Sequence, residues 1–87
     1  MTQLVTVKSK GIRGPAYLIF SYAAVTSTEP TADEDEVVVD YDIDGEVVGI
    51  ELVAITPDTI RGLVAVAYTH ELDLSLLFTQ NVTMTPV

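Results

Sequence analysis

The acidic residues in the middle of the chain have the type and spacing that could bind a cation. Asp40, Asp42 and Asp44 alternate with other residues, Gly45 follows them, and Glu51 completes the series at its twelfth position. Calcium-binding loops between two helices use this pattern, with oxygen ligands at positions 1, 3, 5 and 12 and a glycine at position 6. These four acids are therefore the candidate metal ligands of the chain.

The residues around these acids argue against a calcium site. β-Branched runs flank the Asp44-Gly45 pair, and such runs favour strands over the helices that border a calcium loop. On a strand, acids two residues apart lie on one face in steps of about 7 Å and do not converge on one ion. We therefore expect no metal ion and no cofactor, with weak Ca²⁺ binding by the acidic hairpin as an alternative.

Catalytic residue types are few. The chain has no cysteine and one histidine, His70, which we expect at the end of a helix. Acid–base chemistry by two of the hairpin carboxylates would need a substrate cleft between them, and a domain of 87 residues offers little room for one. The sequence places no activating group beside Ser21 or Ser75. We expect that the protein is not an enzyme.

The net charge of −9 is concentrated in one segment. Residues 1–28 hold three bases and no acid, residues 29–51 hold ten acids and no base, and residues 52–87 hold three acids and one base. An acidic chain repels a phosphate backbone, so we expect no nucleic-acid partner. Neither a run of 18 apolar residues nor a secretory signal is visible, so we expect no membrane partner and a cytoplasmic, bacterial-type protein.

The stretch from Val37 to Val53 predicts a β-hairpin. Asp44-Gly45 between two β-branched runs is typical of a two-residue type I′ turn, which pairs residues whose numbers sum to 89. The expected inner face carries Val37, Val39, Tyr41, Ile43, Val48, Ile50 and Leu52, with Glu46 at its tip. The expected outer face carries Val38, Asp40, Asp42, Val47, Gly49, Glu51 and Val53.

The remaining patterns predict a single domain over residues 1–87. Strands are expected at about 3–8, 16–22, 37–43 and 46–54, helices at about 57–69 and 73–79, a solvated loop over 27–36 and a frayed tail at 82–87. Thr56 and Pro57 form a helix start, and Asp73 can cap the second helix. Within the first helix, Ile60, Leu63, Val64 and Ala67 are expected to face the sheet, with Arg61 and Ala65 turned outward.

This order of elements predicts the fold class. Strands followed by helices indicate an α+β protein, with a small antiparallel sheet of three to four strands arranged as a meander. The C-terminal helices are expected to pack on one face of that sheet.

The hairpin resembles a known family. From Val37 to Leu52 the sequence is similar to the acidic VVVDYD-x-DG-x-VVGIEI hairpin of the bacterial and archaeal domain of unknown function 2283. The likeness covers about residues 4 to 55 and includes the tyrosine-containing strand before the hairpin. The chain departs from the family at Arg13-Gly14-Pro15, where an acidic turn is common, and in a longer central loop. The resemblance implies a small α+β domain without an established activity, and some members are similar in genomic setting to the small partner of a toxin–antitoxin pair.

The expected outer sheet face predicts association. It would expose Val38, Val47 and Val53, together with Tyr17 and Ile19 from the preceding strand, and these five are the candidate interface residues. A contiguous apolar patch on a small protein usually marks an interface, and a symmetric dimer is the commonest way to bury one. We therefore predict a non-enzymatic domain that forms a homodimer. The alternative is an antitoxin-like acidic module that binds a small basic partner protein.

Overall fold

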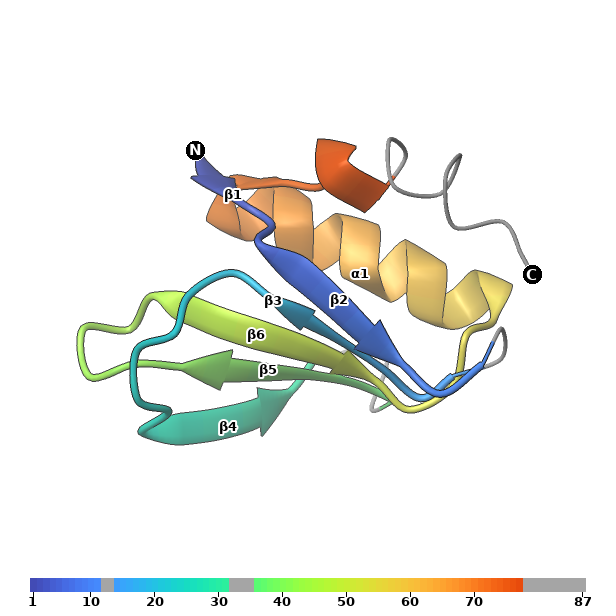
Figure 1. Ribbon diagram of the computed structural model, residues 1–87, viewed down its shortest axis with the longest axis horizontal. Helices are drawn as coiled ribbons and strands as arrows, with labels where there is room; N and C mark the ends of the chain where they lie inside the picture. Colours follow the sequence, from blue (N-terminus) through green and yellow to red (C-terminus); the bar gives the residue numbers. More distant parts are fainter. Residues whose placement is uncertain (12–13, 32–35, 78–87) are drawn as a thin grey trace.

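The computed structural model describes residues 1–11, 14–31 and 36–77, and it forms two layers (Figure 1). Along these residues the strands are β1 (Thr2–Gln3), β2 (Thr6–Ser9), β3 (Ala16–Ile19), β4 (Ser27–Pro30), β5 (Val37–Tyr41), β6 (Val47–Leu52) and β7 (Leu72–Asp73). The helix α1 (Pro57–His70) lies across one face of the main sheet. No helix of this part of the chain is long and apolar enough to span a bilayer.

The main sheet is antiparallel throughout and confirms the α+β class. Its strand order is β2-β3-β6-β5-β4, and a separate parallel pair joins β1 to β7. The sheet is larger than predicted and is not a simple meander. The last strand of this sheet in chain order, β6, lies at its centre, between β3 and β5. The strand β3 therefore pairs with β6 rather than with β4, which follows it in the chain.

The extra strand, β4, occupies part of the segment predicted as a solvated loop. Ser27 pairs with Tyr41 and Pro30 with Val38 at the edge of the sheet. All four β4 residues are exposed, so no alternation of apolar and polar residues marks the strand in the sequence. Pro30 at the end of the strand is a common protection for a sheet edge. Residues 32–35 of the predicted loop lie outside the described residues.

Two predicted strands are shorter than expected. The strand predicted at 3–8 is divided into β1, which pairs with β7, and β2, which begins the main sheet. The strand predicted at 16–22 ends at Ile19, because the N–H groups of both Phe20 and Ser21 donate to the carbonyl of Val48 and break the ladder. Tyr22 is consequently exposed.

The β5–β6 hairpin has the predicted register along its inner part and a different turn. Val37 pairs with Leu52 and Val39 with Ile50, as expected, but a β-bulge follows Asp40 and shifts the next pair. The turn prediction is wrong: Asp44 does not have positive φ, and the Gly45 N–H donates to the carbonyl of Asp42 at 3.0 Å. The connection is a type I turn followed by a left-handed glycine, the three-residue alternative to type I′.

The bulge and the turn move Val47 and Ile43 from their predicted positions. Tyr41 pairs with Val47 instead of Val48, and Val47 joins the core with 6% of its surface exposed. Ile43, predicted on the inner face, lies in the turn and is 84% exposed. An extra residue in one strand changes the side-chain alternation beyond it, which is why these predictions failed.

The helix begins as predicted but packs with a rotated face. Thr56 caps α1 by accepting from Thr59 N at 3.1 Å, with Pro57 in the first turn. The buried residues are Thr59, Leu63, Val66 and Ala67, so the predicted contacts of Ile60 and Val64 with the sheet are wrong. Thr59 can be buried because its hydroxyl donates to the carbonyl of Ala54 at 2.7 Å. Arg61 and Ala65 are exposed, as predicted.

The core lies between α1 and the inner face of the sheet. It is one cluster of buried residues, which includes Leu18, Val37, Ile50, Leu52 and Leu63. After β7, Asp73 accepts from Ser75 N at 2.9 Å and caps a helical turn over residues 75–77. The rest of the predicted second helix, at 78–79, and the predicted frayed tail at 82–87 lie outside the described residues.

Candidate functional site

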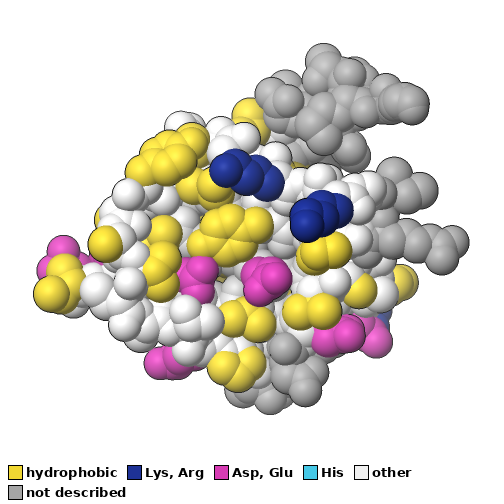
Figure 2. All heavy atoms as spheres, turned by 60° about the horizontal axis from the view of Figure 1, so that its bottom comes forward, with side chains coloured by type: hydrophobic (Ala, Val, Ile, Leu, Met, Phe, Trp, Pro, Cys, Tyr) yellow, Lys and Arg dark blue, Asp and Glu magenta, His cyan; other side chains and the backbone are white. Residues whose placement is uncertain are grey.

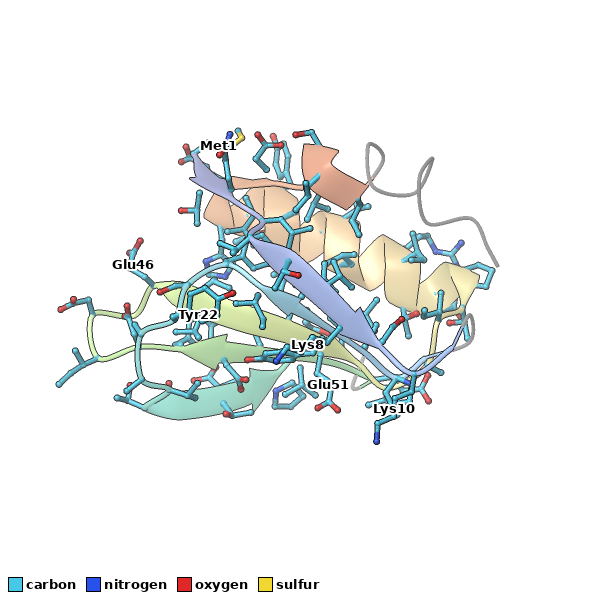
Figure 3. All side chains as sticks on the ribbon, in the orientation of Figure 1. Met1, Lys8, Lys10, Tyr22, Glu46 and Glu51 are labelled. Atoms are coloured by element: carbon cyan, nitrogen blue, oxygen red, sulfur yellow. The ribbon has the colours of Figure 1, made fainter. Side chains whose placement is uncertain are left out.

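No described helix or strand covers the outer face of the five-stranded sheet, which is the face away from α1. Strand alternation and the observed pairing arrange its residues in three rows across the strands. The rows are Lys10–Pro15–Val53–Glu36, Lys8–Tyr17–Glu51–Val38–Pro30 and Thr6–Ile19–Gly49–Asp40–Thr28. Lys8, Lys10 and Glu51 are seen on the side of the sheet away from α1 in Figure 3.

A hydrogen-bonded network crosses the middle of this face. The Tyr17 hydroxyl donates to Oδ2 of Asp40 at 2.6 Å, and the Thr28 hydroxyl donates to Oδ1 of the same carboxylate at 2.6 Å. The Tyr17 ring lies over Gly49, where an added Cβ would overlap the end of the ring. Both Asp40 oxygens are therefore already occupied by donors from neighbouring strands.

Tyr17 is a hydrogen-bond donor and not a base. Burial raises its pKa strongly, and the hydrogen bond to Asp40 and the negative charges of Asp40 and Glu51 raise it further. The phenol thus stays protonated across the physiological range. This network can position groups on the face, and it supplies no activated nucleophile.

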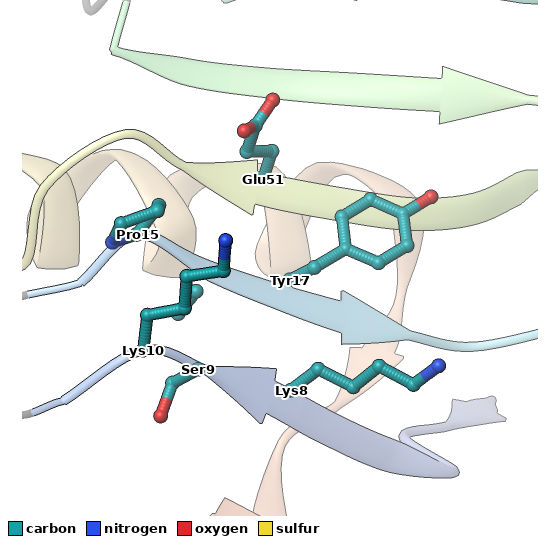
Figure 4. Close-up of a pocket in the computed structure, with 7 residues that line it drawn as sticks. Lys8, Ser9, Lys10, Pro15, Tyr17 and Glu51 are labelled. Atoms are coloured by element: carbon teal, nitrogen blue, oxygen red, sulfur yellow. The ribbon is translucent and has the colours of Figure 1, made fainter.

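A hollow of about 400 Å³ lies beside the network, between β2 and β6 (Figure 4). Lys8 and Lys10 form one side of it, Glu51 the other, and Pro15 and Tyr17 line it between them. Figure 4 shows Lys10 reaching over β3 towards Glu51. The ion pair found among the described residues joins Arg61 and Asp58 on α1, so neither lysine is paired within the described chain.

Hydrophobic side chains lie between the lysines and the acidic side chains on this surface (Figure 2). Of the predicted interface residues, Tyr17 and Val38 are half-buried on the outer face and Val53 is 48% exposed there. Ile19 also belongs to this face but is already buried, and Val47 lies in the core. The structure thus brings three of the five candidates together as accessible surface.

The four candidate metal ligands have separate environments. Asp40 belongs to the outer-face network, and Asp42 accepts from the N–H groups of Asp44 at 2.8 Å and Glu46 at 2.9 Å in the hairpin turn. Asp44 is exposed in that turn, and Glu51 lies beside the hollow. Within residues 1–11, 14–31 and 36–77, no three His, Asp or Glu side chains are grouped closely enough to hold a metal ion.

His70 lies at the end of α1, as the sequence indicates. Its Nε2 is 3.5 Å from the Tyr41 hydroxyl, and the two rings are tilted with centroids 5.7 Å apart. Burial and the charge of Glu29 raise the pKa of Tyr41. This pair is on the core side of the sheet, away from the outer-face network.

Sequence reasoning missed Lys8, Lys10, Thr28 and Gly49 as members of the candidate site. By the alternation of side chains along a strand, the two lysines lie on the same face as Tyr17. This can be recognised only when it is known that β2 pairs with β3. Thr28 lies on the unpredicted strand β4. For Gly49 the available signal is a glycine within a β-branched run, which often marks close approach of another group.

Comparison with known proteins finds a family model that matches part of the chain. Neither curated proteins nor solved structures give a match. The model of the family described as Protein of unknown function (DUF2283) matches residues 16–55, which contain β3 to β6 and thus Tyr17, Asp40 and Glu51. Through this segment, which is less than half of the chain, the protein is similar to the DUF2283 family.

Proposed function

We propose that the protein is a non-catalytic binding domain that associates with a second copy of itself through the outer face of its five-stranded sheet. The observation that carries the proposal is the composition of that face. Tyr17, Val38, Pro15 and Val53 form an apolar band, and the carboxylate beside them, Asp40, already has both oxygens hydrogen-bonded. Among the described residues, no helix or strand covers this band.

The internal hydrogen bonds lower the cost of burying this face. A buried polar group without a partner costs about 1–3 kcal/mol, and a carboxylate costs more. Asp40 retains two O–H donors when water is removed, and Tyr17 stays neutral. Burial of the apolar band then contributes about 25 cal/mol for each Å² removed from water.

The size of the face predicts a weak dimer. Five strands about 4.8 Å apart and three rows about 6.8 Å apart give a footprint of at most about 480 Å² for each copy. Specific stable interfaces bury about 800 Å² on each partner, and transient ones are smaller. A dimer that forms in the micromolar concentration range is therefore expected.

Analytical ultracentrifugation over a concentration series tests the proposal with two matched variants. Val53→Lys places a charge on the outer face, whereas Val64→Lys places the same charge on α1, and the two valines are 48% and 54% exposed. We expect wild type and Val64→Lys to form a dimer and Val53→Lys to remain monomeric.

Two outcomes would contradict the proposal. A wild-type protein that stays monomeric at millimolar concentration would exclude self-association as its function. Loss of the dimer in Val64→Lys but not in Val53→Lys would move the interface to the exposed apolar row of α1, which consists of Ile60, Val64 and Tyr68.

A further inference from the structure

We infer that the two copies meet with their twofold axis parallel to the strands, so that Lys8 and Lys10 of each copy contact Glu51 and Glu36 of the other. This inference rests on the proposed dimer and specifies the contacts within it. It follows from the distribution of charge across the outer face and from the symmetry of a pair of identical chains.

The charged residues of the outer face are sorted by strand. Lys8 lies on β2 and Lys10 directly follows that strand, at one edge of the sheet. Glu51 lies on β6, and Glu36 precedes β5 with its carbonyl accepting from Val53 N at 2.9 Å. One side of the face is therefore basic, and the centre and the other side are acidic.

Symmetry then selects one orientation. A twofold axis that runs along the strands between β3 and β6 places β2 of one copy over β5 of the other, and β3 over β6. Lysines then face acids in both halves of the interface. An axis across the strands would place β2 over β2 and bring Lys8 and Lys10 against their own copies, which is repulsive.

The packing distance suits these contacts. Aligned sheets stack about 10 Å apart with their strands within about 30° of each other. Long lysine and glutamate side chains that project from opposite sheets can meet across this space. In this orientation the hollow beside Lys8 and Lys10 faces Glu51 and Val53 of the second copy, so the partner's side chains fill it.

A charge-swap experiment tests the orientation. One double variant carries Lys8→Glu and Lys10→Glu, and the other carries Glu36→Lys and Glu51→Lys. Each places like charges against each other in its own homodimer, so the dissociation constant should rise about tenfold or more. Mixing the two variants should restore a heterodimer, seen by ultracentrifugation or by native mass spectrometry.

A control separates the contacts from net charge. Asp44→Lys with Glu46→Lys changes the net charge by the same amount as the Glu36/Glu51 variant but lies in the hairpin turn, away from the hollow. This variant should dimerise as the wild type does, and mixing it with the Lys8/Lys10 variant should not restore dimerisation of that variant. Circular dichroism establishes that each variant is folded.

The outcomes distinguish the orientation from the dimer itself. A wild-type dimer whose charge-swapped variants do not pair would overturn the orientation and leave the proposed function intact. A monomeric wild type would overturn both. Wild-type dissociation measured against NaCl concentration requires no variant, and a dissociation constant that does not rise with salt would also overturn the charge contacts.

Discussion

Replacement of Gly49 by alanine would test the packing of Tyr17 over the centre of the sheet. An added Cβ would overlap Oη and Cζ of Tyr17 and would lie 2.9 Å from Cε2. These atoms are the far end of one side chain, so the ring would move rather than the backbone. Its hydroxyl would then lose the 2.6 Å hydrogen bond to Asp40.

Two opposing contributions set the change in the free energy of unfolding that Gly49→Ala should cause. A hydrogen bond to a charged group contributes about 1.5–3 kcal/mol, and alanine is favoured over glycine in a strand by about 0.5–1 kcal/mol. Gly49→Ala should therefore lower the free energy of unfolding by about 1–2 kcal/mol. In a Tyr17→Ala background the overlap and the hydrogen bond are both absent, so the same substitution should raise stability by about 0.5–1 kcal/mol.

Urea denaturation of the four proteins in this double-mutant cycle measures the coupling directly. We expect an interaction free energy of about 2 kcal/mol between positions 17 and 49, within the range for residues in contact. Equal effects of Gly49→Ala in both backgrounds would refute the placement of the ring over Gly49. A stabilising effect in the wild-type background would refute it as well.

Three further predictions concern single groups. Because folding raises the pKa of Tyr17, the contribution of this phenol to stability should be complete below its ordinary pKa of about 10 and should decrease as pH rises above that value. Urea denaturation at several pH values should show that Tyr17→Phe removes this part of the alkaline decrease. Identical pH profiles for the wild type and the variant would contradict the prediction. Thr59→Val should cost about 1–3 kcal/mol in thermal unfolding because the carbonyl of Ala54 loses its donor, and Thr59→Ser should cost less. Asp42→Ala should cost about 1 kcal/mol because two turn N–H groups lose their acceptor, and Asp42→Asn should restore most of it; equal losses would show that the turn does not depend on this acceptor.

The predictable parts of the fold depend on local chemistry. Thr56 and Pro57 supply a cap and a preset φ angle at one point in the chain, so the start of α1 could be located without tertiary information. The register of Val37 and Val39 was predictable because a shift by one residue would bury Asp40 of β5.

The unpredicted parts depend on competing local bonds or on distant neighbours. The Asp42 carboxylate accepts two N–H groups and stabilises a three-residue loop where Asp-Gly alone favours a two-residue turn. β4 is held by backbone bonds to β5 and carries no buried side chain, so it has no periodic signal.

The candidate site also has parts that could be predicted from the sequence and parts that depend on residues distant in the chain. Tyr17 and Asp40 are 23 residues apart, and their hydrogen bond requires both the position of β6 between them and the absence of a side chain at Gly49. The acids of the hairpin were visible in the sequence, but their partners were not. That Tyr17, Val38 and Val53 share the outer face was predictable, whereas the division of that face into basic and acidic sides required the strand order.

The central position of β6 has a consequence for biosynthesis. Ribosomes deliver β2, β3, β4 and β5 before β6, so the nascent chain contains two hairpins whose inner edges have no partner. Ala16 cannot meet Leu52 until 36 further residues have been added, and this late pairing joins the two halves in one step. Until then the edges of β3 and β5 can pair with other chains, so release of a fragment that ends before Val47 should lead to aggregation rather than to a stable half-sheet.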